Sequence, residues 1–195
     1  MAAICLLAGA TLGYLFRGSE SAKVQTQTAQ LPMDNPEGAP PQVPGLDDMK
    51  RMADKQAEPL LARLKSDPNN SDLLNQIGMI YKATHQFNDA IAYYGKAVEV
   101  SPKNVAARTD LASCLYYLGN TDGALEQLKK SLTYKPKDVN SLFNLGMIRW
   151  QGKKDSKGAL AAWSELLKAN PQLEQSKKAQ VEKLIAQVSQ QSRID

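Results

Sequence analysis

The chain of 195 residues contains one histidine and two cysteines, and it has no glycine-rich phosphate loop. His85 stands between Thr84 and Gln86 with no acidic partner beside it, which indicates a solvated turn residue rather than an acid–base catalyst. Cys5 and Cys114 form no C-x-x-C motif, so the spacing of a zinc site or a thiol redox pair is missing. We therefore predict no catalytic residue, no metal site and no cofactor, and we do not expect an enzyme.

Aromatic residues are also sparse, at 6% of the chain, whereas alanine is frequent. This composition favours helices that pack closely through small side chains. The formal net charge is only +4, and lysines and arginines are interleaved with acidic residues along most of the chain. Such interleaving is typical of a solvated surface, so we predict no nucleic-acid partner.

Charged residues are absent from the first 16 positions, and this apolar run ends at Arg17. About 20 apolar residues are needed to cross the hydrocarbon core as a helix, so residues 1–17 are predicted to be a short single-pass membrane anchor or an uncleaved signal. A cleaved secretory signal is the alternative, although the small residues that follow make no good A-x-A site. Gly9 and Gly13 have the G-x-x-x-G spacing that would allow two such helices to form a homodimer.

Residues 18–45 hold five of the ten prolines and show no apolar period. The segment is predicted to be a disordered, extended tether that holds the folded part away from the bilayer. A proline-rich ligand for another domain is the alternative interpretation. The prolines are Pro32, Pro36, Pro40, Pro41 and Pro44.

From Asp47 onward the apolar residues recur with the 3.6-residue period of a helix. Pro68, Pro102 and Pro136 are 34 residues apart, and Pro171 follows 35 residues later, which is the spacing of stacked repeats. We predict three helix pairs between a flanking helix at the start and a capping helix with its tail at the end. The predicted ranges are 46–70 for the flanking helix, 71–104, 105–138 and 139–171 for the pairs, and 172–195 for the capping helix and tail.

Small residues recur where the two helices of each pair are expected to cross most closely. Gly78 is expected against Ala90, Ala112 against Ala124, and Gly146 against Ala159. A larger side chain at a crossing would separate the helices or strain their rotamers, at a cost of about 1–3 kcal/mol. The predicted packing residues are Gly78, Ala90, Ala97, Ala112, Ala124, Gly146 and Ala159.

This pattern resembles the tetratricopeptide repeat, and the first pair matches that pattern at every diagnostic position. The resemblance implies an all-α superhelix of three repeats with flanking helices, preceded here by the predicted membrane helix. Two departures occur within the repeats. Arg108 replaces the usual large apolar residue. The third unit is one residue longer, so either Arg149 or Trp150 could occupy the fourth diagnostic position of its first helix.

The resemblance also implies that the first helices of the repeats line a groove for a partner protein or peptide. We expect Tyr116, Phe143, Met147 and Trp150 to form an exposed apolar patch there, although neighbouring helices are the alternative location for Phe143 and Trp150. A clamp for peptide carboxylates is not expected, because its cationic half is missing. The predicted groove residues are Asn75, Met79, Lys82, Thr109, Ser113, Tyr116, Phe143, Met147 and Trp150.

The arrangement of anchor, tether and repeats predicts a membrane-anchored adaptor that binds a peptide or helix and performs no catalysis. It looks like the bacterial c-type cytochrome biogenesis factors, a resemblance that implies apocytochrome c as the partner and repeats in the periplasm. Arg17 and Lys23 follow the apolar run, which favours cytoplasmic repeats instead, so both orientations stay open. A structural scaffold subunit of a bacterial envelope assembly or secretion complex is the alternative function.

Overall fold

The computed structural model describes residues 45–191 of the chain. The predicted anchor at 1–17, its Gly9 and Gly13, and nearly all of the predicted tether lie outside the described residues. Within the described residues the chain forms eight α-helices. These are α2 (Leu46–Ser66), α3 (Ser71–Ala83), α4 (Phe87–Val100), α5 (Val105–Tyr117), α6 (Thr121–Tyr134), α7 (Val139–Lys153), α8 (Ser156–Ala169) and α9 (Gln175–Gln191).

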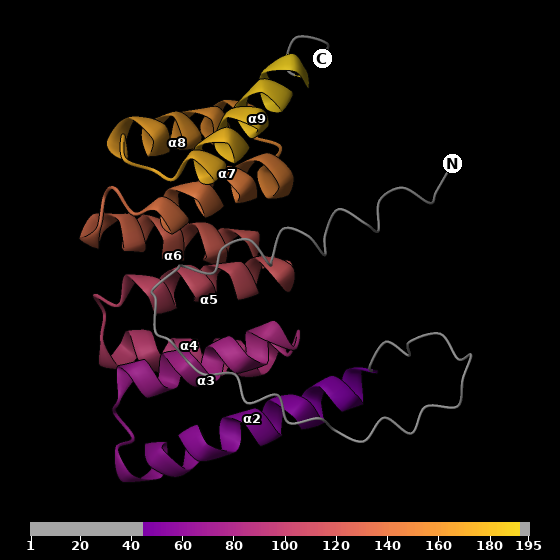
Figure 1. Ribbon diagram of the computed structural model, residues 1–195, viewed down its shortest axis with the longest axis vertical. Coiled ribbons are helices and arrows are strands. Elements are labelled where there is room, and N and C mark those ends of the chain that lie inside the picture. The colour runs from indigo at the N-terminus through magenta and orange to yellow at the C-terminus, as the bar shows by residue number, and fades with distance from the viewer. Residues whose placement is uncertain (1–44, 192–195) are drawn as a thin grey trace. The chain divides into compact units, whose positions relative to one another are not determined.

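The helices of residues 45–191 stack in the order of the chain, each packed against the one before and the one after (Figure 1). Helices α3 and α4, α5 and α6, and α7 and α8 form the three pairs. The first helices of successive pairs also contact one another directly, α3 with α5 and α5 with α7. The prediction of an all-α repeat array is therefore confirmed for this part of the chain, in which no helix has the length and apolar character to span a membrane.

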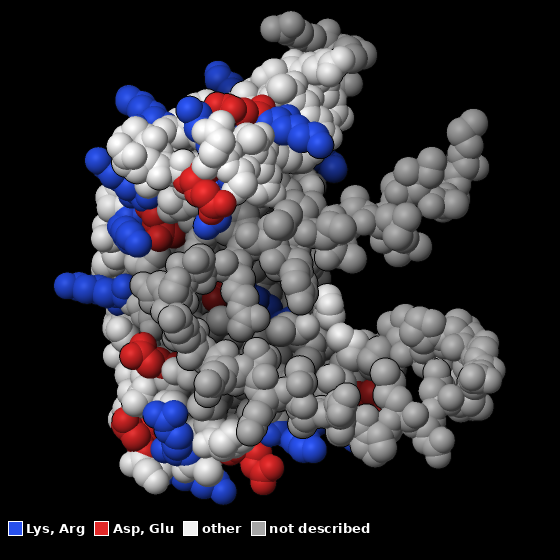
Figure 2. All heavy atoms as spheres, viewed as in Figure 1, with Lys and Arg blue, Asp and Glu red and all other residues white. Residues whose placement is uncertain are grey.

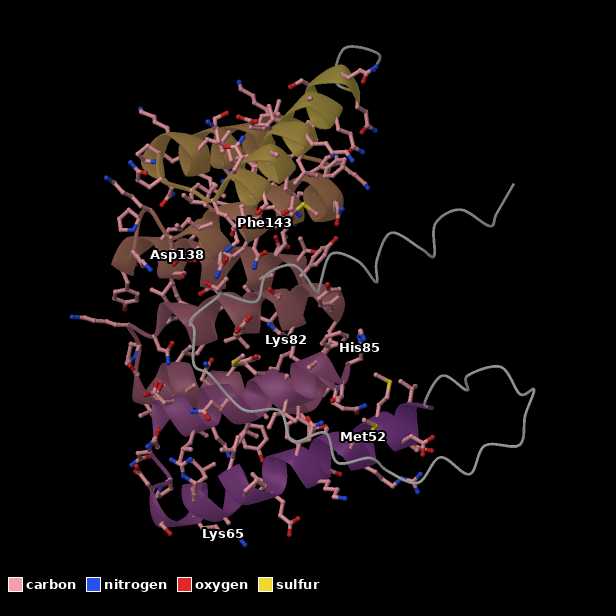
Figure 3. All side chains as sticks on the ribbon, in the orientation of Figure 1. Met52, Lys65, Lys82, His85, Asp138 and Phe143 are labelled. Carbon is pink, nitrogen blue, oxygen red and sulfur yellow. The ribbon has the colours of Figure 1, made fainter. Side chains whose placement is uncertain are left out.

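The starts of α3, α5, α6, α7 and α8 are fixed by short polar side chains that accept hydrogen bonds from the first free backbone N–H groups. Asn70 accepts from the backbone nitrogens of Asp72 and Leu73 at 3.1 and 3.0 Å. Asn104 and Asp138 cap α5 and α7 in the same way. The turns between pairs lie at one end of the helices, near Asp138, and the turns within pairs lie at the other end, near His85 (Figure 3).

The predicted small residues lie at the helix crossings, but the two glycines face aromatic rings rather than alanines. A methyl group added at Gly78 would lie 2.7 Å from Cε1 of Tyr94, and one added at Gly146 would overlap the indole of Trp163. The expected partners, Ala90 and Ala159, are fully buried one helical turn before those rings. In the first and third pairs the crossing therefore places a glycine against a ring that fills the space left by the missing side chain.

The two sequence departures are accommodated by polar contacts. The Arg108 guanidinium is buried, and it donates to Oε1 of Gln127 at 2.8 Å and to the carbonyl of Pro102 at 2.7 Å. The extra residue of the third unit lengthens α7, which has 15 residues where α5 has 13. Arg149 takes the position that faces α8, because its Nη1 donates to the carbonyl of Gly158 at 3.3 Å.

We predict that replacing Gly146 with alanine lowers the free energy of unfolding by about 1–3 kcal/mol, because the new methyl group displaces Trp163. Gly95 of α4 is the matched control, since a side chain there meets no atom within 4 Å. Gly95→Ala should raise the free energy of unfolding by up to about 1 kcal/mol through helix propensity. Urea unfolding followed by circular dichroism measures both changes, and equal effects of the two substitutions would contradict the packing role of Gly146.

Candidate functional site: the inner face of the first helices

Side chains of α3, α5 and α7 that are not packed into the second helices share one face of the array, which we call the inner face. They recur at three- and four-residue intervals along each helix, which places them on one side of it. Contacts between α3 and α5 and between α5 and α7 join the three helices into one surface. The inner face consists of Asn75, Met79, Lys82, Asp110, Ser113, Tyr116, Asn144, Met147 and Trp150.

An ion pair crosses the inner face between the first two repeats. Lys82 of α3 binds the carboxylate of Asp110 of α5 through its ammonium group, and the two side chains are 32% and 25% exposed. Lys82 lies between these two helices (Figure 3). Asp110 was not among the predicted groove residues, although it follows the predicted Thr109 directly. The pair neutralises the one cation and the one acid of the inner face.

Below this ion pair lie two buried groups that stay uncharged at neutral pH. Tyr94 is fully buried and its hydroxyl has no hydrogen-bond partner within residues 45–191. Burial, and next the charge of Asp110, raise the pKa of this hydroxyl. Burial also raises the pKa of the Cys114 thiol to about 12, against a smaller opposing effect of Lys82. The ion pair therefore rests on neutral, weakly polar neighbours.

Two asparagines supply the hydrogen-bonding groups of the inner face. The Asn75 amide donates weakly to the sulfur of Met79 at 3.8 Å, and its carbonyl Oδ1 is buried without a partner among the described residues. The Asn144 amide of α7 donates to Oγ of Ser113 on α5 at 3.2 Å. The Asn75 amide oxygen is therefore a buried acceptor without a partner among the described residues, whereas the Asn144 amide joins two repeats.

The apolar part of the inner face is smaller than predicted. Met79 is 49% exposed, whereas Met147, Tyr116 and Trp150 are half-buried. The Trp150 ring meets the ring of Trp163 edge-on, with centroids 6.1 Å apart, so this side chain belongs partly to the α7–α8 core. A partner would therefore find one exposed methionine and the edges of three further apolar side chains.

Two predicted groove residues are buried, which corrects their expected role. Phe143 is only 6% exposed, and its carbonyl accepts a hydrogen bond from the Trp163 indole at 3.1 Å, which holds this part of α7 against α8. Thr109 is 4% exposed, because its hydroxyl joins those of Ser131 and Ser141 at 3.2 and 2.8 Å. Neither side chain offers the exposed surface that the sequence pattern predicted.

The remaining candidate groups of the sequence do not form part of the exposed inner face. His85 is exposed at the turn after α3, where its ring packs edge-on against Phe87 with centroids 5.6 Å apart. Cys114 is completely buried. No group of His, Cys, Asp or Glu side chains within residues 45–191 is arranged to hold a metal ion.

Comparison with known proteins finds similarity to one family of helical repeats. Residues 81–145 match the model of the tetratricopeptide repeat family. Anaphase-promoting complex subunit 3 of Schizosaccharomyces pombe (strain 972 / ATCC 24843) is 35% identical over 88 residues, which are 45% of this chain and 13% of that protein. The chain thus spans about an eighth of that curated relative.

Two solved structures share the fold. YrrB, described as a tetratricopeptide repeat protein with an unusual peptide-binding site, superimposes with a TM-score of 0.58 at 22% identity, over 69% of this chain and 68% of that chain. The first repeat domain of Spaghetti (RPAP3) bound to the HSP90 peptide SRMEEVD gives a TM-score of 0.56 at 18% identity, over 63% and 93%. Together with the family match, these structures show that the described helices form a tetratricopeptide repeat array. Neither they nor the curated relative supports the narrower resemblance to cytochrome biogenesis factors.

We predict that Tyr94→Phe raises the free energy of unfolding by about 1 kcal/mol, because it removes a buried hydroxyl that has no partner and keeps the ring. Tyr81→Phe is the matched control, since the Tyr81 hydroxyl donates to Asp54 at 2.9 Å. That substitution should lower the free energy of unfolding by about 1 kcal/mol. Urea unfolding measures both, and destabilisation by Tyr94→Phe would show that its hydroxyl has a partner.

The Cys114 thiol is predicted to be unreactive in the folded protein. In a Cys5→Ser variant, modification by a disulfide reagent at pH 8 should require urea, because the folded thiol stays protonated below a pKa of about 12. The unfolded thiol, with its ordinary pKa of 9.0, loses its proton first, so this group's contribution to stability is lost as the pH rises from 9 towards 12. Rapid modification of the native variant at pH 8 would contradict this burial.

Proposed function

We propose that the repeat array is an adaptor that binds a peptide or helical segment of another protein on its inner face. The observation that carries this proposal is the exposed Met79 side chain beside the half-buried side chain of Asn75. Methionine adapts its shape to different apolar partners, and a side-chain amide can pair with the backbone of an extended peptide. The peptide-bound structure of the same fold supports this use of the array.

We assign no catalytic step to the protein. The exposed thioether of Met79 and the neighbouring Asn75 amide supply neither a proton nor a nucleophile for acid–base or covalent catalysis. The histidine lies at an exposed turn and the described cysteine is buried. Binding and presentation of a partner are the functions that these residues can perform.

The cellular setting of this adaptor is a further part of the proposal. The uncharged run of residues 1–16 supports attachment to a membrane as a single-pass protein. With this attachment we propose that the repeats lie in the periplasm and that apocytochrome c is a candidate partner, as the sequence resemblance suggests. A fusion of a compartment-specific reporter to the C-terminus determines the side of the membrane independently of any partner.

A structural subunit of an envelope assembly is the second candidate function. It is favoured by a different surface, where the ring of Tyr117 stacks on that of Phe87 with centroids 4.8 Å apart and an angle of 11°. Tyr117 is 61% exposed and the adjoining Leu118 is 47% exposed. These side chains, at the turn after α5, would suit a permanent contact with another subunit.

Site-specific photocrosslinking in cells tests the proposed function and separates it from the alternative. A benzophenone amino acid at Met79 should capture a partner, whereas one at Val100, which is 41% exposed at the end of α4, should not. Met79→Asp should weaken capture from a neighbouring inner-face position, Met147, by tenfold or more, because burial of a methionine contributes about 1.5–3 kcal/mol. Capture only from Tyr117, unchanged by Met79→Asp, would support the structural subunit instead.

A further inference from the structure

The ion pair of Lys82 and Asp110 gives the inner face a specific electrostatic character. Of the nine inner-face residues, Lys82 alone is cationic and Asp110 alone is acidic. Arg108 and Arg149, on the same helices, are engaged elsewhere with Gln127 and with the carbonyl of Gly158. In the view of Figure 2 the charged side chains of the described atoms are mixed in sign rather than gathered into one patch.

The surroundings of the ion pair disfavour an acidic ligand that would compete with Asp110 for Lys82. The side chains of Lys82 and Asp110 are both more than two-thirds buried. Their neighbours Tyr94 and Cys114 are neutral at physiological pH. Attraction between opposite charges is stronger in such surroundings than in bulk water. An acidic ligand that took Lys82 would leave Asp110 partly buried and unpaired, which is the costly way to break an ion pair.

We propose that Asp110 is a specificity-determining residue, because its ion pair with Lys82 keeps the lysine from binding carboxylates of a partner. The inner face then selects uncharged internal segments of a partner chain over acidic segments and free C-terminal carboxylates. A neutral segment leaves the ion pair intact, and it finds an apolar contact at the exposed Met79 beside the side-chain amide of Asn75. This inference rests on the proposed binding of peptides by the inner face.

The test uses the purified full-length chain in detergent micelles and a synthetic library of random hexapeptides as the probe. The library is offered in two forms, with a C-terminal amide and with a free carboxylate, and bound peptides are identified by mass spectrometry. The wild-type chain should enrich peptides of low charge and show no preference for the free carboxylate. Asp110→Asn should enrich acidic and free-carboxylate peptides by about tenfold relative to the wild type, because Lys82 is released.

Asp72→Asn is the matched control. Asp72 is an exposed acid in the first turn of α3, and no ion pair to it is present within residues 45–191. Its substitution removes the same charge without releasing Lys82, so the wild-type selection should persist. The double variant Lys82→Gln/Asp110→Asn should lose the acidic preference, which shows that the preference arises from the lysine rather than from a general loss of negative charge.

The double variant covers the case in which Asp110→Asn unfolds, as judged by thermal unfolding, because it leaves neither charge partly buried without a partner. It should bind acidic and free-carboxylate peptides no less than the wild type does, and a loss of such ligands from it would overturn the inference. Enrichment of such peptides by the wild type, or by Asp72→Asn as much as by Asp110→Asn, would also overturn the inference while leaving peptide binding intact. Absence of any enriched peptide with the wild type would refute the proposed function itself, and the inference with it.

Discussion

In the first and third pairs the closeness of the two helices depends on the contact between a glycine and an aromatic ring. Gly78 lies against Tyr94, and Gly146 lies against Trp163, where a methyl group would overlap the ring. The glycine permits the approach and the ring fills the space, so neither residue alone defines the crossing. Trp163 adds a directional bond, because its indole donates to the carbonyl of Phe143. The crossing of α7 and α8 is thus fixed by shape and by a hydrogen bond together.

The inner face is a consequence of this tight pairing. Because the second helices cover one side of the first helices, α3, α5 and α7 can meet one another only along their remaining sides. Their side chains then form contacts between repeats, such as the ion pair of Lys82 with Asp110 and the hydrogen bond of Asn144 with Ser113. Several polar side chains of the inner face are therefore already engaged in contacts between repeats. A partner can bind only the side chains that do not take part in these contacts.

The repeat array could be predicted from the sequence because its determinants are local and periodic. The spacing of Pro68, Pro102 and Pro136 and the helix-capping residues determine where the helices begin and end, and α3, α5 and α7 start at the predicted residues. The depth of a side chain is not local. Thr109 is buried because it meets hydroxyl groups 22 and 32 residues later in the chain, contacts that the pattern of a single repeat does not contain. Asp110 became part of the site for the same reason, through a lysine 28 residues earlier.

The interfaces between successive repeats differ in chemistry, and this difference shapes the inner face. Between the first two repeats the corresponding positions are the buried, apolar Ala97 and Ala107. Between the second and third they are Ser131 and Ser141, whose hydroxyls bond to each other at 2.8 Å and to Thr109. A fully paired buried polar cluster favours one arrangement of its neighbours over others. Because Thr109 bonds to this cluster, the middle of the inner face is formed by Asp110 and Ser113 instead. Asp110 then determines the charge of the inner face, since its carboxylate neutralises Lys82.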